Sequence, residues 1–251
     1  MAEPPHGLPF SQLALGVVCP MANEAETAAV FVDAVLAECA RYAFRVVAFY
    51  AVVDRASRDD TRAVLEGHAA LRPELRVVWA PETRGVADAY VRGYREALAA
   101  GTDLVLEIDA GFSHAPADIP RFLDAFAAGA DCVFGTRFGA GGRNLAARRR
   151  RVVSRGGTML ANFLLGTTLT DMTSGFELFS SGALEHVLER GIRSKGPFFQ
   201  TEIKAHCGGL RVAEVPITYT AGSHRLGWHA VAESLRNLAW LFVERTGRRW
   251  R

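Results

Sequence analysis

Residues 104–120 read LVLEIDAGFSHAPADIP, and this stretch decides how the rest of the chain is interpreted. Leu104–Ile108 is a largely apolar run, which predicts a buried strand. The run ends at the carboxylate of Asp109, Gly111 allows a turn, and Pro116 signals the start of a helix. A strand that ends in this way is typical of an α/β sheet, in which ligands bind beyond the carboxyl ends of the strands.

Apolar runs alternate with helical patterns on both sides of this stretch. Such alternation predicts a mainly parallel sheet with helices on both faces, within a single domain of residues 1–251. The expected strands are Leu13–Cys19, Phe44–Val53, Arg76–Trp79, Leu104–Ile108, Asp131–Gly135 and Leu210–Ile217. The expected helices are Glu24–Arg41, Ser57–Leu71, Val86–Ala100, one from Pro116, one that follows the basic loop TRFGAGGRNLAARRRR, one after the turn DMTSGF, and an amphipathic basic helix at 229–251.

Composition narrows the class of protein. A net charge of +2 argues against nucleic acid as a partner, although basic residues cluster at Arg148–Arg151 and toward Arg251. The four cysteines lack metal-ligand or redox spacing and are expected to be reduced core thiols. No apolar stretch approaches the ~18 residues of a membrane span. We therefore expect a cytoplasmic protein, either soluble or peripheral on the cytoplasmic face of a membrane.

Polar residues follow three of the expected strands. Pro20, Asn23 and Glu24 follow the first, Asp54 follows the second, and Asp109 follows the fourth. Because parallel strands end at one rim of a sheet, these groups are expected to lie together. Acids there can hold a divalent cation or the edge of a nucleobase, and arginines can hold phosphates. The combination indicates a nucleotide-diphosphate substrate.

Each feature also has a purely structural interpretation. Asp54 with Ser57 suits a helix N-cap, the pair after Pro20 suits another helix start, and Asp109 suits an Asx-turn. Their joint position at one rim favours a site. A dinucleotide-binding protein is excluded because no glycine cluster follows the first strand.

Five motifs, taken in order, resemble a known family. They are CPMANEAE, VVDRASRDDT, GVADAYVRGYREALAAGTDLVLEIDAGFSHAPADIP, GADCVFGTRF and DMTSGF. Together they resemble family 2 glycosyltransferases of the dolichyl- or polyprenyl-phosphate mannosyltransferase type, over about Leu13 to Trp228. The resemblance implies a GT-A fold, a nucleotide-sugar donor, Mg²⁺ or Mn²⁺ on the diphosphate, and inversion at the anomeric carbon. It also implies a nucleotide-sugar-binding half at 10–136 and an acceptor and catalytic half at 137–228.

The same resemblance assigns roles to individual residues. Those matching the family's nucleotide pocket are Pro20, Asn23, Glu24 and Asp54. Asp109 opens the family's D-x-D motif and is the implied metal ligand, while Arg137 and the basic residues after it contact phosphates. His224 and Arg225 stand where the family has a serine-lysine element that grips the diphosphate.

One departure from the family concerns the metal. The usual second aspartate of D-x-D is Gly111 here. Mg²⁺ keeps several waters and needs few protein carboxylates, so a weakened metal site is expected rather than none. Gln200 or Glu202 can fill the gap. A nucleotide-sugar-binding protein without turnover is the alternative that this departure raises.

The acceptor decides which other residues are needed. A lipid phosphate is largely ionised, so it needs cationic guidance rather than a base, and Arg149, Arg151 and Ser154 are candidates, although each can equally lie on a solvated basic face. A soluble hydroxyl acceptor, as in specialised-metabolite biosynthesis, needs a general base. Asp171 is the best candidate, with turn capping as its structural alternative, and Glu202 is the second.

The acceptor that we expect is a polyprenyl phosphate, with the hydroxyl compound as the alternative. The amphipathic C-terminal helix, with its basic end, suits peripheral contact with anionic lipid or packing on the core. His114, His206 and His229 show no ligand spacing and are interpreted as surface or structural residues.

Overall fold

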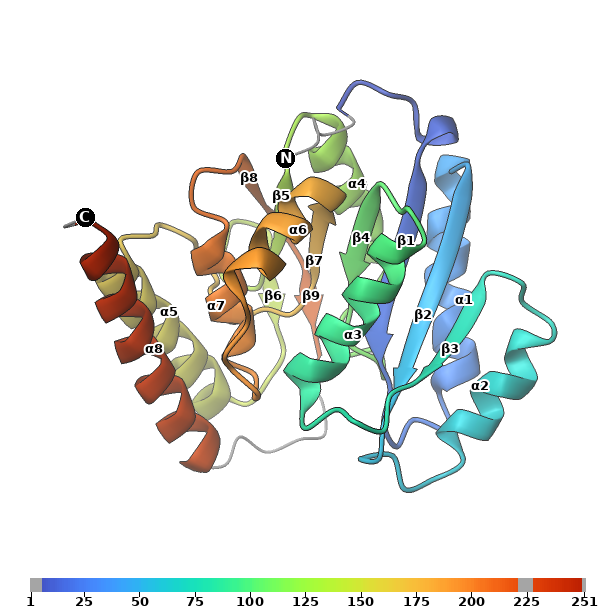
Figure 1. The fold of residues 1–251 in the computed structure, drawn as a ribbon, viewed down its shortest axis with the longest axis horizontal. Helices are drawn as coiled ribbons and strands as arrows, with labels where there is room; N and C mark the ends of the chain where they lie inside the picture. Colours follow the sequence, from blue (N-terminus) through green and yellow to red (C-terminus); the bar gives the residue numbers. More distant parts are fainter. Residues whose placement is uncertain (1–5, 221–227, 250–251) are drawn as a thin grey trace.

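The computed structural model describes residues 6–220 and 228–249, in which a twisted sheet is covered by helices on both faces (Figure 1). The described residues form a seven-stranded sheet of order β3-β2-β1-β4-β7-β5-β8 and a two-stranded sheet, β6-β9. Every neighbouring pair is parallel except those that involve β7. The strands are β1 (Ala14–Pro20), β2 (Val46–Val53), β3 (Leu75–Trp79), β4 (Leu104–Glu107), β5 (Cys132–Thr136), β6 (Arg143–Asn144), β7 (Glu177–Ser180), β8 (Val212–Pro216) and β9 (Thr218–Tyr219).

Helices cover the two faces of the sheet in separate groups. One apolar cluster joins α1, α2 and α4 to the sheet, and a second joins α3, α6 and α7 to its other face. The pair α5 and α8 lies side by side at one end of the molecule (Figure 1). The α-helices are α1 (Ala28–Cys39), α2 (Thr61–Ala69), α3 (Val86–Ala99), α4 (Ile119–Ala127), α5 (Arg148–Leu165), α6 (Ser181–Arg190), α7 (Phe199–His206) and α8 (Trp228–Arg249). Three short 3₁₀ helices lie at Phe10–Gln12, Ala40–Tyr42 and Pro116–Asp118.

The alternation of side chains along β1 explains why both faces are covered. Val17 and Cys19 point into the first cluster, whereas Val18 points into the second. On that second face, Gly93 of α3 lies so close to the sheet that a Cβ there would be 3.0 Å from Val52. The strand is therefore buried on both sides, as the continuous apolar sequence predicts. No helix among the described residues combines the length and apolar character needed to cross a lipid bilayer.

Strand β7 was not predicted from the sequence, and neither were the short strands β6 and β9 or helix α7. Strand β7 lies between β4 and β5, antiparallel to both, and places Glu177 directly opposite Glu107. The strand is only four residues long and begins with a buried carboxylate, so it lacks the continuous apolar run that marks β1 and β2.

Two predicted helix starts were too early. Helix α2 begins at Thr61, because the Ser57 hydroxyl donates to Asp59 (3.1 Å) instead of capping the helix. Helix α1 begins at Ala28 rather than at Glu24, since Asn23 has a left-handed backbone (φ 61°) and the next residues form turns.

Candidate functional site

The loops that follow β1 and β2 are fastened to each other by hydrogen bonds. The Asn23 amide donates to the Ala56 carbonyl (3.2 Å), and its oxygen accepts from the Arg58 N–H (2.9 Å). The Asp59 carboxylate accepts from the Thr61 hydroxyl (2.6 Å), and this bond is the main cause that lowers the pKa of Asp59 to about 2. In the structure Asn23 ties the loop after β1 to the loop after β2, and its role in a nucleotide pocket stays a prediction.

Asp54 connects the loops that follow β2 and β3. One carboxylate oxygen accepts from the Ala56 N–H (2.8 Å) and the other from the Thr83 hydroxyl (2.8 Å). Pro20, the last residue of β1, pairs with Val52 beside this loop. The carboxyl ends of the first strands therefore meet at one rim, as the sequence predicts.

Asp109 lies two residues beyond β4, and its carboxylate is partly open to solvent. Its side chain is 43% exposed, and the hydroxyl of Tyr90 on α3 donates to it at 2.6 Å. Its second oxygen lies 3.6 Å from Nδ1 of His114. Gln200 approaches from α7: a Cβ at Gly175 would lie 2.8 Å from Gln200 Nε2 and 3.5 Å from Asp109 Oδ2. Tyr90 and His114 also belong to this group, and neither was predicted from the sequence as a site residue.

His114 is buried beside Asp109 without a hydrogen-bond partner. Its side chain is 1% exposed, and neither ring nitrogen is hydrogen-bonded to any described residue. Burial lowers the pKa of His114 to about 4, against the opposing effect of Asp109, so the ring is neutral near pH 7. The ring packs against Phe176 and Tyr219, at centroid distances of 5.4 and 5.1 Å.

Gly111, the departure from D-x-D, faces Glu24. Gly111 has a left-handed backbone (φ 71°), and a Cβ there would lie 2.9 and 3.0 Å from the two carboxylate oxygens of Glu24. The Thr27 hydroxyl donates to Glu24 Oε2 at 2.8 Å, and the Glu24 N–H donates to the Thr61 hydroxyl at 2.8 Å. These bonds hold Glu24 against the turn that follows Asp109.

Below Asp109 a second group of charges is completely buried. Glu107 accepts hydrogen bonds from Tyr94 and from Gln200, and Glu177 is paired with Lys204. Burial and then the charge of Glu177 raise the pKa of Glu107 well above its ordinary value, so this carboxyl holds its proton more tightly than an exposed glutamate does. Burial also raises the pKa of Glu177 to about 7, and Lys204 limits the rise. Gln200 thus supports the site from beneath, through Glu107.

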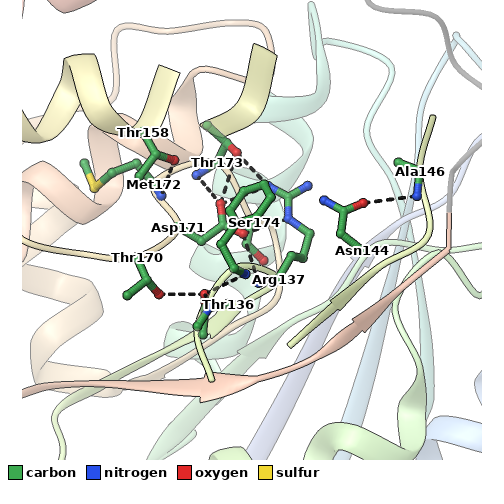
Figure 2. A network of polar contacts seen from close by, with 12 residues as sticks. Thr136, Arg137, Asn144, Ala146, Thr158, Thr170, Asp171, Met172, Thr173 and Ser174 are labelled. Carbon is green, nitrogen blue, oxygen red and sulfur yellow. Dashed lines mark hydrogen bonds and ion pairs between the residues drawn. The ribbon is translucent and has the colours of Figure 1, made fainter. Parts of the chain in front are cut away.

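Asp171 is locked in an ion pair with Arg137 (Figure 2). The guanidinium donates from Nε and Nη2 at 2.7 and 2.9 Å, and the N–H and hydroxyl of Thr173 donate at 3.0 and 3.1 Å. The side chain of Asp171 is 0% exposed and that of Arg137 is 5% exposed. Burial favours the neutral acid, but the bonds and charge of Arg137 outweigh it and lower the pKa of Asp171. Asp171 therefore holds the turn, which is the structural role named above as the alternative to a general base. Its role as a base stays a prediction.

The arginine run begins α5 next to this group. Arg149 and Arg151 are exposed, Ser154 is half-buried, and Arg151 donates to the carbonyl of Asn144 at 3.2 Å. Arg150 lies over the ring of Tyr219 at 5.6 Å. Because Tyr219 in turn contacts the ring beside Asp109, the basic helix start lies near the same edge as the open carboxylate.

Three other residues predicted for the site remain: Glu202, His224 and Arg225. Glu202 is 1% exposed, and its oxygens accept from the backbone N–H groups of Arg193 (2.8 Å) and Ser194 (2.9 Å). It therefore holds the loop before α7, and its role as metal ligand or base stays a prediction. His224 and Arg225 lie outside the described residues.

The site offers few side chains that could bind a divalent cation. Within the described part of the chain, no group of three or more His, Cys, Asp or Glu side chains is placed to hold a metal ion. The open carboxylate of Asp109 and the carboxylate set against Gly111 supply oxygen, the ligand atom that Mg²⁺ and Mn²⁺ prefer. Such a set suits a cation that takes its remaining ligands from phosphate and water.

Comparison with known proteins agrees with this architecture. The sequence model described as Glycosyl transferase family 2 matches residues 16–188. Undecaprenyl-phosphate mannosyltransferase of Micrococcus luteus is 33% identical over 193 residues, which cover 74% of this chain and 79% of that protein. Polyprenol monophosphomannose synthase of Mycolicibacterium smegmatis is 34% identical over 209 residues, covering 81% of this chain and 76% of that protein.

A solved structure extends the likeness to the fold. Glucosyl-3-phosphoglycerate synthase from Mycobacterium tuberculosis, in complex with Mn²⁺, UDP-glucose and phosphoglyceric acid, superimposes with a TM-score of 0.65. The match covers 94% of this chain and 80% of that one, at 18% sequence identity. At this identity the likeness shows the fold alone, and it confirms the GT-A architecture that the resemblance implied.

Proposed function

The chain belongs to glycosyl transferase family 2, and from that premise we propose that it transfers a sugar from a nucleotide diphosphate to a polyprenyl phosphate. The observation that carries the proposal is the position of the open carboxylate of Asp109 near the arginine-rich start of α5. The names of the two curated relatives support the lipid acceptor and favour mannose as the sugar.

The donor binds at the rim formed by residues 10–136. Pro20, Asn23, Glu24 and Asp54 surround the nucleotide, and the fastened loops keep this pocket in one shape. Asp109 would hold the Mg²⁺ or Mn²⁺ that accompanies the diphosphate. When bound, the cation offsets the charge that develops on the leaving diphosphate.

The transfer itself needs charge and alignment rather than a base. A phosphate monoester has a second pKa of about 6, so the acceptor arrives ionised at neutral pH. One of its oxygens forms the bond to the anomeric carbon while the bond from that carbon to the nucleoside diphosphate breaks, and the diphosphate leaves with the electron pair. Attack from the opposite side inverts the anomeric centre. Arg149, Arg151 and Ser154 guide the acceptor phosphate.

The basic start of α5 is unusual for a helix and supports this role. Four consecutive arginines occupy the first turn, where the helix dipole favours anions, and no acidic residue lies there. Backbone N–H groups and guanidinium groups at one place form a strong attraction for a phosphate. The buried pair of Arg137 and Asp171 keeps the nearby turn rigid.

The outer face of α5 and α8 supports peripheral contact with a membrane on its cytoplasmic side. Val152, Met159 and Phe163 of α5 follow at helical spacing and are 63%, 67% and 84% exposed. Leu235 and Val243 of α8 are 53% and 66% exposed. Apolar side chains beside a basic helix end suit anionic lipid, in which a polyprenyl phosphate would also be dissolved.

A vesicle experiment tests this membrane contact. Binding to phosphatidylglycerol vesicles should fall at least about tenfold in Met159→Ser/Phe163→Ser. Each of these apolar side chains would contribute ~1.5–3 kcal/mol to binding when it moves from water into the lipid. The matched control is Val30→Ser/Leu71→Ser, which removes two equally exposed apolar side chains from α1 and the loop after α2. Equal binding by the two double variants would refute the assignment.

The function is tested with purified protein, a short-chain polyprenyl phosphate, and a panel of GDP and UDP sugars that includes the mannose donors. We expect a lipid-linked mannose to form. In Arg149→Gln/Arg151→Gln the acceptor KM should rise about tenfold while the donor KM is unchanged, since each lost charge-assisted bond is worth ~1 kcal/mol or more. Arg41→Gln/Arg62→Gln removes the same charge elsewhere and is the control.

Three results would contradict the proposal. Formation of no lipid-linked sugar with any donor would exclude the lipid acceptor. Turnover on a soluble hydroxyl compound instead would establish the alternative acceptor, and binding of a nucleotide sugar with no turnover on any acceptor would establish a non-catalytic protein.

A further inference from the structure

The carboxylate of Glu24 occupies the space into which a side chain at residue 111 would project. A Cβ at Gly111 would lie 2.9 Å from one oxygen of Glu24 and 3.0 Å from the other. The aspartate that the family carries at this position would begin at that point. The loop after β1 therefore brings a carboxylate, from 87 positions earlier in the sequence, to the turn that has lost one.

We propose that Glu24 is the second carboxylate of the metal site and takes over the role of the aspartate that Gly111 replaces. The inference rests on the proposed function, because the cation concerned is the one that accompanies the nucleotide diphosphate. The protein then supplies one oxygen ligand from each of two loops, and phosphate and water complete the shell.

The hydrogen bonds of Glu24 leave it ready for this role. The Thr27 hydroxyl donates to Oε2 at 2.8 Å and fixes the direction of the carboxylate. Oε1 accepts no hydrogen bond from the described residues. Carboxylates that bind a cation are typically oriented by a neighbouring hydrogen-bond donor and keep one oxygen available for the ion, and Glu24 has both properties.

Two buried side chains around Asp109 point independently to a bound polar group. Neither ring nitrogen of His114, nor Oε1 of Gln200, has a hydrogen-bond partner among the described residues, and these side chains are 1% and 4% exposed. Buried polar atoms are nearly always satisfied. Since His114 Nδ1 lies 3.6 Å from Asp109 Oδ2, a cation or the water in its shell at Asp109 would supply a partner.

The first experiment measures Mn²⁺ affinity from the electron paramagnetic resonance signal of the free ion, with GDP and in parallel with UDP. In Glu24→Gln, Mn²⁺ should bind at least about tenfold more weakly. Glu26→Gln removes the same charge from an exposed position two residues along and should leave Mn²⁺ affinity unchanged. Calorimetry of the nucleotide without metal, on the same variants, separates contact with the cation from contact with the nucleotide.

The second experiment moves the carboxylate from one loop to the other. Glu24→Ala/Gly111→Asp should recover Mn²⁺ affinity to within about tenfold of the wild type, because aspartate tolerates a left-handed backbone better than most residues. Glu24→Ala/Gly111→Asn has the same shape without the charge and should not recover. Thermal unfolding of each variant confirms that it is folded, and a variant that fails to fold is replaced by Glu24→Gln alone as the deciding measurement.

The outcomes that overturn the inference are distinct from those that overturn the function. A loss in Glu24→Gln that is equal with and without Mn²⁺ would place Glu24 on the nucleotide only. Unchanged Mn²⁺ affinity, or a charge-moving variant no better than its asparagine control, would remove Glu24 from the metal site. If the wild type binds neither nucleotide, the proposed function fails, and that result is seen before any variant is compared.

Discussion

Two aspartates at the same edge of the sheet differ in almost every property that matters for chemistry. Asp109 follows β4 and Asp171 precedes β7, and these strands are antiparallel neighbours, so the end of one meets the start of the other. Asp109 is 43% exposed and accepts one hydrogen bond, from Tyr90. Asp171 is completely buried and is held by Arg137 and Thr173. The partners of a carboxylate, rather than its position at the rim, decide what it can do.

The pKa of Asp171 extends the contrast. Burial alone would raise the pKa, yet Arg137 lowers it, so the carboxylate is ionised and its oxygens are already hydrogen-bonded. A general base near neutral pH needs a pKa close to the working pH. Asp171 therefore suits a structural role, which agrees with a phosphate acceptor that carries no proton to be removed.

The largest effect is expected at the open member of the pair. Asp109→Asn should lower turnover by about 10²–10³, the range for losing one preorganised electrostatic contact in a site. Its free energy of unfolding should change by less than ~1 kcal/mol, because the side chain is exposed. Steady-state kinetics and urea unfolding measure the two quantities. Turnover that is indifferent both to this variant and to EDTA would rule out a metal-assisted mechanism.

The buried member should show the opposite behaviour. Asp171→Asn should cost about 3 kcal/mol of stability, because it leaves the charge of Arg137 buried without a partner. The double variant Arg137→Gln/Asp171→Asn removes both charges and should regain part of the loss. In Asp171→Asn the turnover per folded molecule should stay within about tenfold of the wild type.

The contrast would break if Asp171 acts on the acceptor. A rate loss on the order of 10²–10⁴ in Asp171→Asn, with stability intact, is the expected result for a lost general base. That outcome would favour a hydroxyl acceptor over a lipid phosphate.

Glu107 sharpens the comparison through the pH dependence of stability, because it is buried without a cation of its own. An unfolded glutamate titrates at about 4.3, whereas burial and the charge of Glu177 keep Glu107 protonated to higher pH. Between these two pKa values the folded state binds more protons, so stability falls as pH rises, by up to about 1.4 kcal/mol per pH unit. Glu107→Gln should reduce that slope and be more stable than the wild type above neutral pH. The slope that remains below about pH 7 belongs to Glu177, whose pKa burial raises to about 7.

Urea unfolding between pH 5 and pH 9 measures this slope. Glu26→Gln, an exposed glutamate, is the control and should keep the slope of the wild type. An unchanged slope in Glu107→Gln would mean that Glu107 is ionised in the folded protein.

The sequence predicts those elements whose local residue pattern is sufficient to identify them. Continuous apolar runs mark β1, β2 and β4, and their order indicates a mainly parallel sheet with polar groups at one rim. Strand β7 escapes prediction because its central position depends on the pairing of Glu177 with Lys204, which follows 27 positions later. A buried charged residue contradicts the local pattern unless its distant partner is known.

The site divides in the same way. Asp54 and Asp109 stand at strand ends and are found by position alone. The bonds between Arg137 and Asp171, 34 positions apart, and the approach of Glu24 to Gly111 are set by the fold and have no local signal. His114 could have been found, because it lies on the turn directly after Asp109 in a segment that must fold back over the strand end.

The late position of β7 in the chain has a consequence for how the protein is made. A ribosome releases β4 and β5 well before Glu177–Ser180, which must enter between them. Until then the facing edges of both strands carry unpaired backbone groups, and such edges readily pair with strands of other chains. Domains tend to fold as units during synthesis, so the gap between β4 and β5 cannot close until β7 has emerged. The nascent chain is most exposed to aggregation in the interval between the completion of β5 and the emergence of β7, and chaperones would serve it best there.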